Sequence, residues 1–265
     1  MKTFRSLAIA ALLLSFAALG FAQEPTENGN RWHWTGKLAP DQVVVIRNVN
    51  GDIDATGSSS SDQIEVTAEK TGTDADQVKI HLQKVGDGVV ICAVYPGMFS
   101  SSSEGDCEST SHFGNNHNNA RVDFTVRMPQ NLRFTGRSVN GAVRAESMGR
   151  YVDAESVNGG IHVQTQSWAS ASSVNGSIDA RLGRTDWPGE LDFKTVNGSV
   201  KLEMPSNLNA DVDFKSVNGH LESDFPLTVQ GSIGKHVLHG TIGSGGRELN
   251  VKTVNGSVEL RKAGV

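Results

Sequence analysis

The sequence has little of what marks several common protein classes. Of its 265 residues, 7 are proline, 2 are cysteine and 6% are aromatic. Glycine is plentiful, with 29 residues, but it follows no triplet period, which excludes a collagen-like chain. Only 37% of the residues are hydrophobic, yet they are placed too regularly for a disordered chain. At this length we therefore expect a folded chain with a substantial core.

The chain also carries little net charge. The formal net charge is −5, and residues 1–22 hold two basic residues and no acidic one, so the remainder carries −7. Lysine and arginine form no cluster along this mildly acidic chain, which argues against nucleic acid as a partner.

A long apolar run occurs only near the N-terminus. Lys2 and Arg5 precede an apolar run of thirteen residues (7–19), and small residues then suit a cleavage site after Ala22. A bilayer span needs about 20 residues, so this run is too short for an anchor. We predict a signal peptide at residues 1–22 and a mature chain without a transmembrane segment. The mature protein is expected outside the cytoplasm, in the periplasm or secreted to the cell surface.

The two cysteines, Cys92 and Cys107, both follow the predicted signal peptide. In an oxidising compartment a lone pair of cysteines usually forms a disulfide, which we predict here, with two free thiols as the alternative. The bridge would close a loop of residues 93–106 and, in the chain-entropy model, add about 3 kcal/mol of stability.

An internal repeat is the strongest signal in the chain. The tripeptide Val-Asn-Gly occurs seven times, and its last six copies follow a Ser or Thr and precede, after one residue, a Val, Ile or Leu. The copies begin at Val49, Val139, Val157, Val174, Val196, Val217 and Val254. Leu238-His239-Gly240 resembles a degenerate copy between the last two.

Apolar and polar residues alternate on both sides of each tripeptide, which predicts β-strands. The alternation changes phase across Val-Asn-Gly, so the chain must bend there, and we expect Asn and Gly to supply a positive φ for that bend. The Val is out of phase with the inward Ser or Thr. It either enters the core through a bulge or forms an apolar stripe on the surface.

Two all-β architectures could use this bend. Asn-Gly between strands is a strong hairpin signal and would give a stack of antiparallel hairpins. Alternatively, each repeat is one coil of a parallel β-solenoid with Val-Asn-Gly as its corner, which the near-constant spacing favours. We assign residues 38–265 to a single solenoid domain, with an N-terminal segment or cap at 23–37 and a long surface loop at 96–119.

The N-terminal half follows the same rules less strictly. No amphipathic helix of ordinary length is expected after residue 22, and Trp32 and Trp34 are candidates for covering the first coil. Strands are predicted at residues 43–46, 64–68, 78–84, 89–94 and 121–128.

An exported chain with recurrent Ser/Thr-Val-Asn-Gly-x-Val/Ile units resembles the bacterial putative adhesin family. That family is an envelope-associated domain of unknown function, related to head domains of autotransporter adhesins. The likeness covers the opening at Val45–Ile53 and the block from Ser138 to Leu260. It implies a right-handed β-solenoid outside the cytoplasm, and it brings no set of catalytic residues.

The asparagines of the repeat block share one repeat position. They would form a corner ladder whose amides hydrogen-bond from coil to coil, or else a row that binds a ligand. We favour the ladder, whose expected members are Asn140, Asn158, Asn175, Asn197, Asn218 and Asn255.

Asp192 and Asp213 also share a repeat position, with Lys194 and Lys215 two residues further along the same face. In consecutive coils these carboxylates would stand one strand spacing apart, about 4.8 Å. Paired carboxylates on a solenoid can hold Ca²⁺ or perform acid–base chemistry, as in polysaccharide lyases and hydrolases. A solvated ladder of exposed charges is the simpler interpretation, because no nucleophile or further acid cluster accompanies them.

No motif of a familiar enzyme class is present in the sequence. His112 and His117 fit a polar surface loop better than a metal site, which would need three or four converging ligands. We therefore predict an adhesin-like, non-catalytic envelope module without metal or cofactor. It would bind a glycan, a surface polymer or an envelope protein through its repetitive β face. The alternative is a carbohydrate-active enzyme, a polysaccharide lyase or hydrolase, on the same solenoid.

Overall fold

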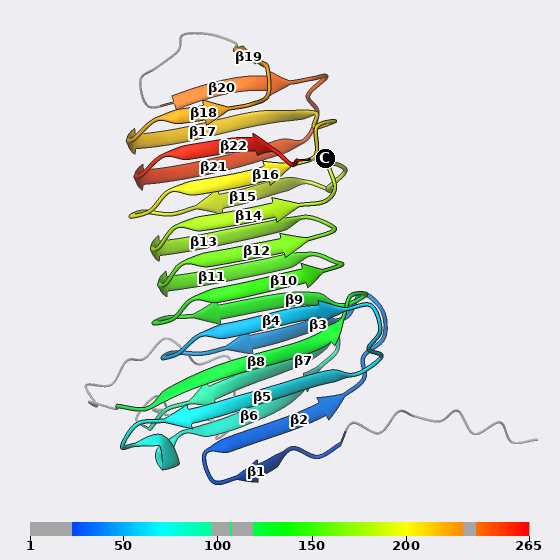
Figure 1. Cartoon of the computed structure of the whole chain (residues 1–265), viewed down its shortest axis with the longest axis vertical. Coiled ribbons are helices and arrows are strands. Elements are labelled where there is room, and N and C mark those ends of the chain that lie inside the picture. The colour runs from blue at the N-terminus through cyan, green and yellow to red at the C-terminus, as the bar shows by residue number, and fades with distance from the viewer. Residues whose placement is uncertain (1–22, 97–106, 108–118, 230–236, 265) are drawn as a thin grey trace, which may run out of the picture.

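The chain coils into two sheets that face each other, as the computed structural model shows (Figure 1). The structure describes residues 23–96, 107, 119–229 and 237–264. The predicted signal peptide and most of the predicted surface loop, with His112 and His117, lie outside the described residues. Consecutive repeats pair in parallel and not as hairpins, so the architecture is the predicted parallel β-solenoid.

Within the described residues, the first sheet contains eleven strands. In spatial order they are β1 (Thr26–Asn28), β2 (Arg31–Gly36), β5 (Ile64–Thr71), β8 (Arg121–Pro129), β4 (Ile53–Ser58), β10 (Val143–Met148), β12 (Ile161–Thr165), β14 (Ile178–Leu182), β16 (Val200–Met204), β22 (Val258–Lys262) and β18 (Leu221–Ser223).

The second sheet also has eleven strands in the part of the chain that the structure describes, and a short 3₁₀ turn, η1 (Ala75–Gln77), connects β5 to β6. In spatial order its strands are β19 (Leu227–Val229), β20 (Val237–Ile242), β17 (Ala210–Asn218), β21 (Glu248–Asn255), β15 (Glu190–Lys194), β13 (Ala169–Asn175), β11 (Val152–Asn158), β9 (Arg133–Ser138), β3 (Val43–Arg47), β7 (Gly88–Val94) and β6 (Lys79–Val85). The strands predicted in the N-terminal half are present as β3 and β5 to β8.

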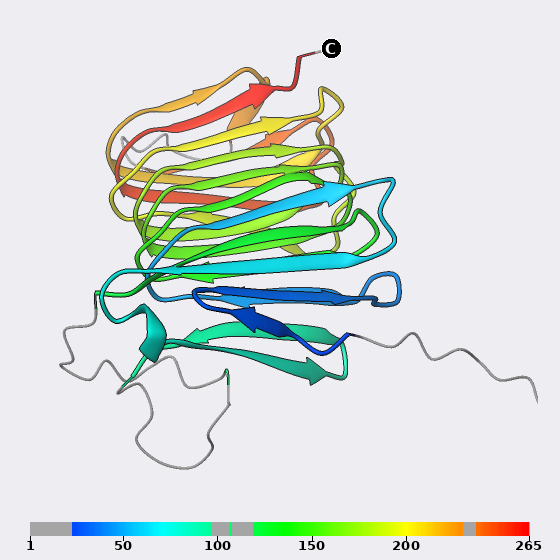
Figure 2. The same ribbon diagram turned by 60° about the horizontal axis from the view of Figure 1, so that its bottom comes forward.

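Each repeat contributes one strand to each sheet, and a Val-Asn-Gly corner joins the two. β11 thus runs into β12 and β13 into β14, and these corners line the left edge of Figure 1. Successive corners lie one above another when the N-terminal end is turned forward (Figure 2). Equivalent residues are register partners, as Ile161, Ile178 and Val200 show. Neighbouring strands lie about 4.8 Å apart, so equivalent side chains of adjacent coils are in contact.

The core fills the space between the sheets because every second strand residue points inward. Phe134, Phe193 and Phe214 are among its largest side chains and are fully buried. At the N-terminal end, Trp32 and Trp34 of β2 are buried in the same core, where β2 pairs antiparallel with β5. The two tryptophans therefore cover the core at this end.

The coils do not follow chain order at the C-terminal end. β21 pairs with β15 on one side and β17 on the other, and β22 lies in the same way between β16 and β18. The last coil of the chain, formed by β21 and β22, thus lies between the coil of β15 and β16 and the coil of β17 and β18 (Figure 1). β20 runs antiparallel to β17, between β17 and the edge strand β19, and Leu238-His239-Gly240 lies within β20. The interpretation of that tripeptide as a degenerate corner was therefore wrong.

Candidate interaction surface at the Val-Asn-Gly corner

In the last six copies of the repeat, the residue before Val points into the solenoid and carries a hydroxyl group. Each of these hydroxyls donates a hydrogen bond of 2.8–3.0 Å to the carbonyl oxygen of the corner Gly in the neighbouring coil, as Ser173 does to Gly159. A buried hydroxyl without a partner would be costly, and this bond removes the cost while joining two coils. The residues are Ser138, Ser156, Ser173, Thr195, Ser216 and Thr253, all buried.

The asparagine side chains form one continuous ladder along the outside of the corner. From Asn140 onward, each Nδ2 donates to the Oδ1 of the asparagine in the adjacent coil on the N-terminal side of the solenoid, at 2.7–2.8 Å. Every interior amide therefore uses one N–H and its oxygen within the protein. In spatial order the ladder consists of Asn50, Asn140, Asn158, Asn175, Asn197, Asn255 and Asn218.

The corner glycines are required by the close approach of adjacent coils. A Cβ added to Gly176 would stand 2.0 Å from the carbonyl oxygen of Gly159, and one on Gly198 would stand 2.3 Å from that of Gly176. The structure describes all seven corners, and none of their asparagines has a positive φ, so that expectation was wrong. Among the corner glycines described, only Gly51 and Gly256 have a positive φ. Backbone stacking, and not a left-handed bend, is the main reason for glycine here.

The Val residues of five adjacent coils face solvent in a line that we call the Val stripe. They are 39–50% exposed, and in the described part of the chain only Val85 is a comparably exposed large hydrophobic residue. At about 4.8 Å per coil the stripe is about 20 Å long. Of the two possibilities that the sequence left open, the surface stripe is the observed one. Its members in spatial order are Val157, Val174, Val196, Val254 and Val217.

The stripe ends toward the N-terminal coils, where the corner is built differently. Val49 is buried, and Asn48 takes the place of the inward hydroxyl. The Asn48 Nδ2 donates to the carbonyl oxygens of Gly51, at 3.0 Å, and Val122, at 2.7 Å. Tyr95 Oη donates to the carbonyl oxygen of Asn50 at 2.9 Å. Burial raises the pKa of Tyr95, so its hydroxyl stays protonated and able to donate.

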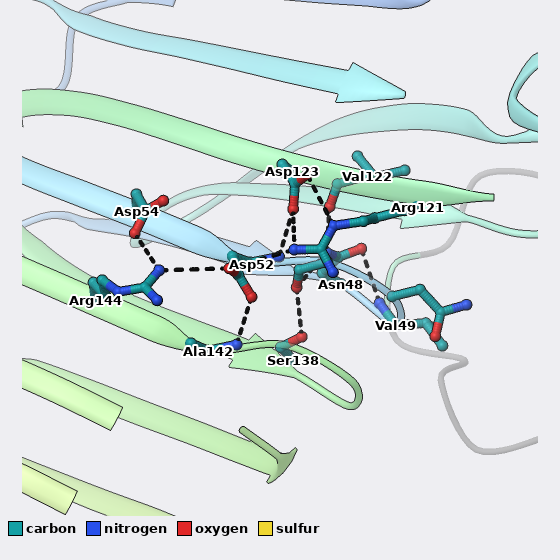
Figure 3. Close-up of polar contacts among 12 residues, drawn as sticks. Asn48, Val49, Asp52, Asp54, Arg121, Val122, Asp123, Ser138, Ala142 and Arg144 are labelled. Carbon is teal, nitrogen blue, oxygen red and sulfur yellow. Dashed lines mark hydrogen bonds and ion pairs between the residues drawn. The ribbon is translucent and has the colours of Figure 1, made fainter. Parts of the chain in front are cut away.

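A network of alternating charges crosses three strands beside this first corner (Figure 3). Arg121 of β8 lies 2.8 Å from Asp123 and 3.3 Å from Asp52. Arg144 of β10 lies 3.5 Å from Asp52 and 3.0 Å from Asp54. The network joins β8, β4 and β10 at the start of the repeat block. The network was not expected from the sequence, although the period-two placement of Asp52 and Asp54 beside a strand was a usable signal.

Asp52 is the centre of that network. Its Oδ1 also accepts the backbone N–H of Ala142 at 2.8 Å. Burial opposes ionisation of Asp52, but this hydrogen bond and the charges of Arg121 and Arg144 outweigh it and hold the pKa of the carboxyl below its usual value. Asp52 is therefore an ionised link between coils.

Asp192 and Asp213 do not lie on neighbouring strands. Asn250 of the inserted β21 is the register partner of both, so two strand spacings separate them. The expectation of adjacent carboxylates was wrong because the order of coils differs from the order of repeats in the chain. Lys194 and Lys215 are likewise separated, by Lys252.

These lysines and aspartates form charged rows beside the Val stripe. Lys194 lies 2.8 Å from Asp192 and Lys215 lies 2.9 Å from Asp213, while Lys252 lies 3.7 Å from Asp213. Partly exposed pairs of this kind are each worth at most about 1 kcal/mol. The rows therefore provide a polar border to the stripe on the second sheet.

Asp213 also borders a groove of about 570 Å³ between β17, β20 and β21. His239 Nδ1 lies 3.2 Å from the Asp213 carboxylate. The hydroxyl of Thr241 donates to Asp211, at 2.9 Å, so it is not activated by His239. Nowhere in the described ranges do three His, Cys, Asp or Glu side chains gather so that they could hold a metal ion.

The structure joins Cys92 of β7 and Cys107 by a disulfide, with their Cα atoms 5.8 Å apart. An N–H of the Arg47 guanidinium in β3 donates to the carbonyl oxygen of Cys107 at 2.6 Å. These two connections hold Cys107 against the second sheet.

The chain belongs to the family described as Toastrack DUF4097, which matches residues 37–261. The match covers all seven corners and agrees with the resemblance to adhesin-like proteins of unknown function. No curated protein matches the chain. None of the residues that the structure describes forms a helix long and apolar enough to cross a membrane.

Two solved structures are similar in fold. One, from Clostridium sporogenes, is described as a "putative cell adhesion protein"; it is 9% identical, with a TM-score of 0.47, over 91% of this chain and 100% of its own. The other, from Bacteroides fragilis, is described as a "putative adhesin"; it is 10% identical, with a TM-score of 0.36, over 89% of this chain and 98% of its own. Both are too distant to carry a function across.

Proposed function

We propose that the protein is a non-catalytic module of the cell envelope that binds an envelope protein along the Val stripe. The observation that carries the proposal is the reversed polarity of the corner, which turns a hydroxyl inward and a Val outward in coil after coil. Burying a Val side chain is worth about 1.5–3 kcal/mol, so folding alone gives no reason to expose five in a line. Contiguous exposed apolar surface is typical of a contact site.

The chemistry of the stripe suits a protein better than a glycan. A sugar needs several hydrogen-bonding groups with unused capacity. The Val side chains have none, and each interior ladder amide beside them already uses its oxygen and one of its two N–H groups within the protein. The Lys and Asp rows supply the polar rim that protein interfaces place around an apolar centre.

An extracytoplasmic location is part of the proposal. It is supported by the predicted signal peptide and by the disulfide between Cys92 and Cys107, since disulfides persist mainly in oxidising compartments.

The test is site-specific photocrosslinking in the native host. A photoreactive residue replaces Val174 in the stripe or, as the matched control, the exposed Asp179 on the first sheet. We expect one discrete crosslinked protein from position 174 and none from 179. Threonine has the same shape as valine, so the combined Val157→Thr, Val196→Thr and Val254→Thr changes should keep the fold and abolish that product.

Equal products from both positions, or a product that survives the threonine changes, would overturn the stripe as a binding surface. Catalysis has its own test, in which residues 23–265 are incubated with neutral and uronate polysaccharides and newly formed chain ends are counted. No new ends are expected. New ends that disappear with Asp192→Ala and Asp213→Ala would replace the binding module by a lyase or hydrolase.

A further inference from the structure

A second groove, of about 510 Å³, lies on the opposite side of the solenoid from the Val-Asn-Gly corner. It runs along the ends of first-sheet strands β10, β12, β14 and β16, which lie on the right side of Figure 1. None of the Val stripe residues lines it. Its volume falls within the range of small-ligand sites in proteins.

A local irregularity of β10 forms one wall of the groove. The register between β10 and β12 shifts between Ala145 and Met148, and Ser147 adopts a positive φ of 54°. The Gln130 side chain donates to the carbonyl oxygen of Ser147 at 2.8 Å, which holds the bulge in place. Bulges redirect side chains at strand ends, and this one lies directly on the groove.

The lining carries several polar groups and is electrically balanced. The Gln164 and Gln166 side chains are exposed along it, and Ser147 and Ser206 add hydroxyl groups. Among the described residues, no Asp or Glu lines the groove, and Arg181 is its one cation. The Arg181 guanidinium is paired with the Glu203 carboxylate, with nitrogen and oxygen 2.6 Å apart.

The floor of the groove is apolar, with Met148, Leu182 and Pro205 among its residues. Amides offer a donor and an acceptor in one plane, which suits the neighbouring hydroxyls of a sugar, and an apolar floor suits its C–H face. A charged ligand would find no unpaired charge in this lining. We propose that the groove binds a neutral, hydroxyl-rich ligand, a sugar unit of a glycan. This inference does not depend on the Val stripe.

The test follows the glutamine side-chain amides by NMR while neutral hexasaccharides (of glucose, mannose and N-acetylglucosamine) are added to residues 23–265. Hexagalacturonate is the charged comparison. We expect saturable shifts of the Gln164 and Gln166 amide signals with at least one neutral sugar. The Gln164→Ala/Gln166→Ala variant should bind at least about tenfold more weakly, because both side chains lose their hydrogen bonds to the sugar.

Two controls separate this site from a general effect. Gln83→Ala, at an exposed glutamine of β6, and Val174→Thr, in the stripe, should leave sugar binding unchanged. The proposal is overturned if no neutral sugar shifts either amide at about 10 mM, where a ligand with a millimolar Kd would be largely bound. It is also overturned if hexagalacturonate binds more tightly or if the double glutamine variant binds like the original chain.

Discussion

The side-chain amide of Asn255 donates to the side chain of Asn197 at 2.7 Å, although the two lie 58 residues apart in the sequence. Asn218 precedes Asn255 in the chain but lies beyond it in space, and donates to Asn255 at 2.8 Å. The C-terminal corner is therefore an interior member of the ladder with a partner on each side. The corner of Asn218 forms the end.

Asn255→Ala should consequently cost more stability than Asn218→Ala. The first change removes two ladder hydrogen bonds and the second removes one, and an exposed bond is worth about 0.5 kcal/mol net. We expect losses of about 1 and about 0.5 kcal/mol in urea unfolding, with Asn175→Ala matching Asn255→Ala. Equal costs at positions 255 and 218, or the reverse order, would contradict the inserted coil.

Gly176→Ala should destabilise the protein strongly, because the new Cβ would stand 2.0 Å from the Gly159 carbonyl oxygen. The clash is with backbone on a neighbouring coil, so relief requires two coils to separate, and we expect a loss of about 3 kcal/mol. Gly86→Ala is the matched control, since nothing lies within 4 Å of its Cβ position and its φ is not positive. It should change the midpoint of unfolding little. A mild effect at Gly176 would show that the coils can separate easily.

The repeat motif was sufficient to predict the strands, the corner and the parallel stacking, because each follows from local alternation and spacing. It could not predict the order of the coils. All corners carry the same tripeptide, so the corner of Asn255 would fit beyond Asn218 as well as between Asn197 and Asn218. In the structure the antiparallel β20 occupies the outer side of β17, and β21 pairs with its inner side.

The same limit applies to the candidate site. The exposed Val stripe could not be settled from the sequence, since the inward direction of Ser173 depends on a carbonyl oxygen in another coil. The assumed neighbourhood of Asp192 and Asp213 failed for the same reason, because Asn250 comes from an inserted strand. Local pattern determines which side of a strand a residue occupies, but only the coil order determines its neighbours.

Glu27→Gln should destabilise the N-terminal end. The Lys70 side chain is 3% exposed, and its ammonium group contacts the Glu27 carboxylate and, at 3.1 Å, the carbonyl oxygen of Val78. Removing the carboxylate leaves a buried charge without its counter-ion, which costs about 3 kcal/mol. Adding Lys70→Met should recover most of that loss in a double-mutant cycle.

Glu69→Gln serves as the control for this pair. Glu69 lies 4.0 Å from Arg31 and both side chains are well exposed, so its loss should be below about 0.5 kcal/mol. If Glu27→Gln were as mild as Glu69→Gln, β1 would not depend on the buried lysine.

Two aspartates should change the acid response of stability in opposite directions. The pKa of Asp52 lies below its usual value, as argued above, whereas burial raises the pKa of Asp153 despite Arg137 nearby. The contribution of Asp52 is therefore present above the unfolded pKa, near about 4, and is lost as the pH falls through the folded value. The folded chain holds the Asp153 proton more tightly than the unfolded chain, so stability falls as the pH rises from about 4 through its folded pKa. Compared with the original protein at the same pH, Asp52→Asn should lose more stability at about pH 7 than at about pH 3. For Asp153→Asn, the stability relative to the original protein should be higher at about pH 7 than at about pH 3. Urea unfolding at both pH values measures this, and a change of the same sign in both variants would refute the assigned charge states.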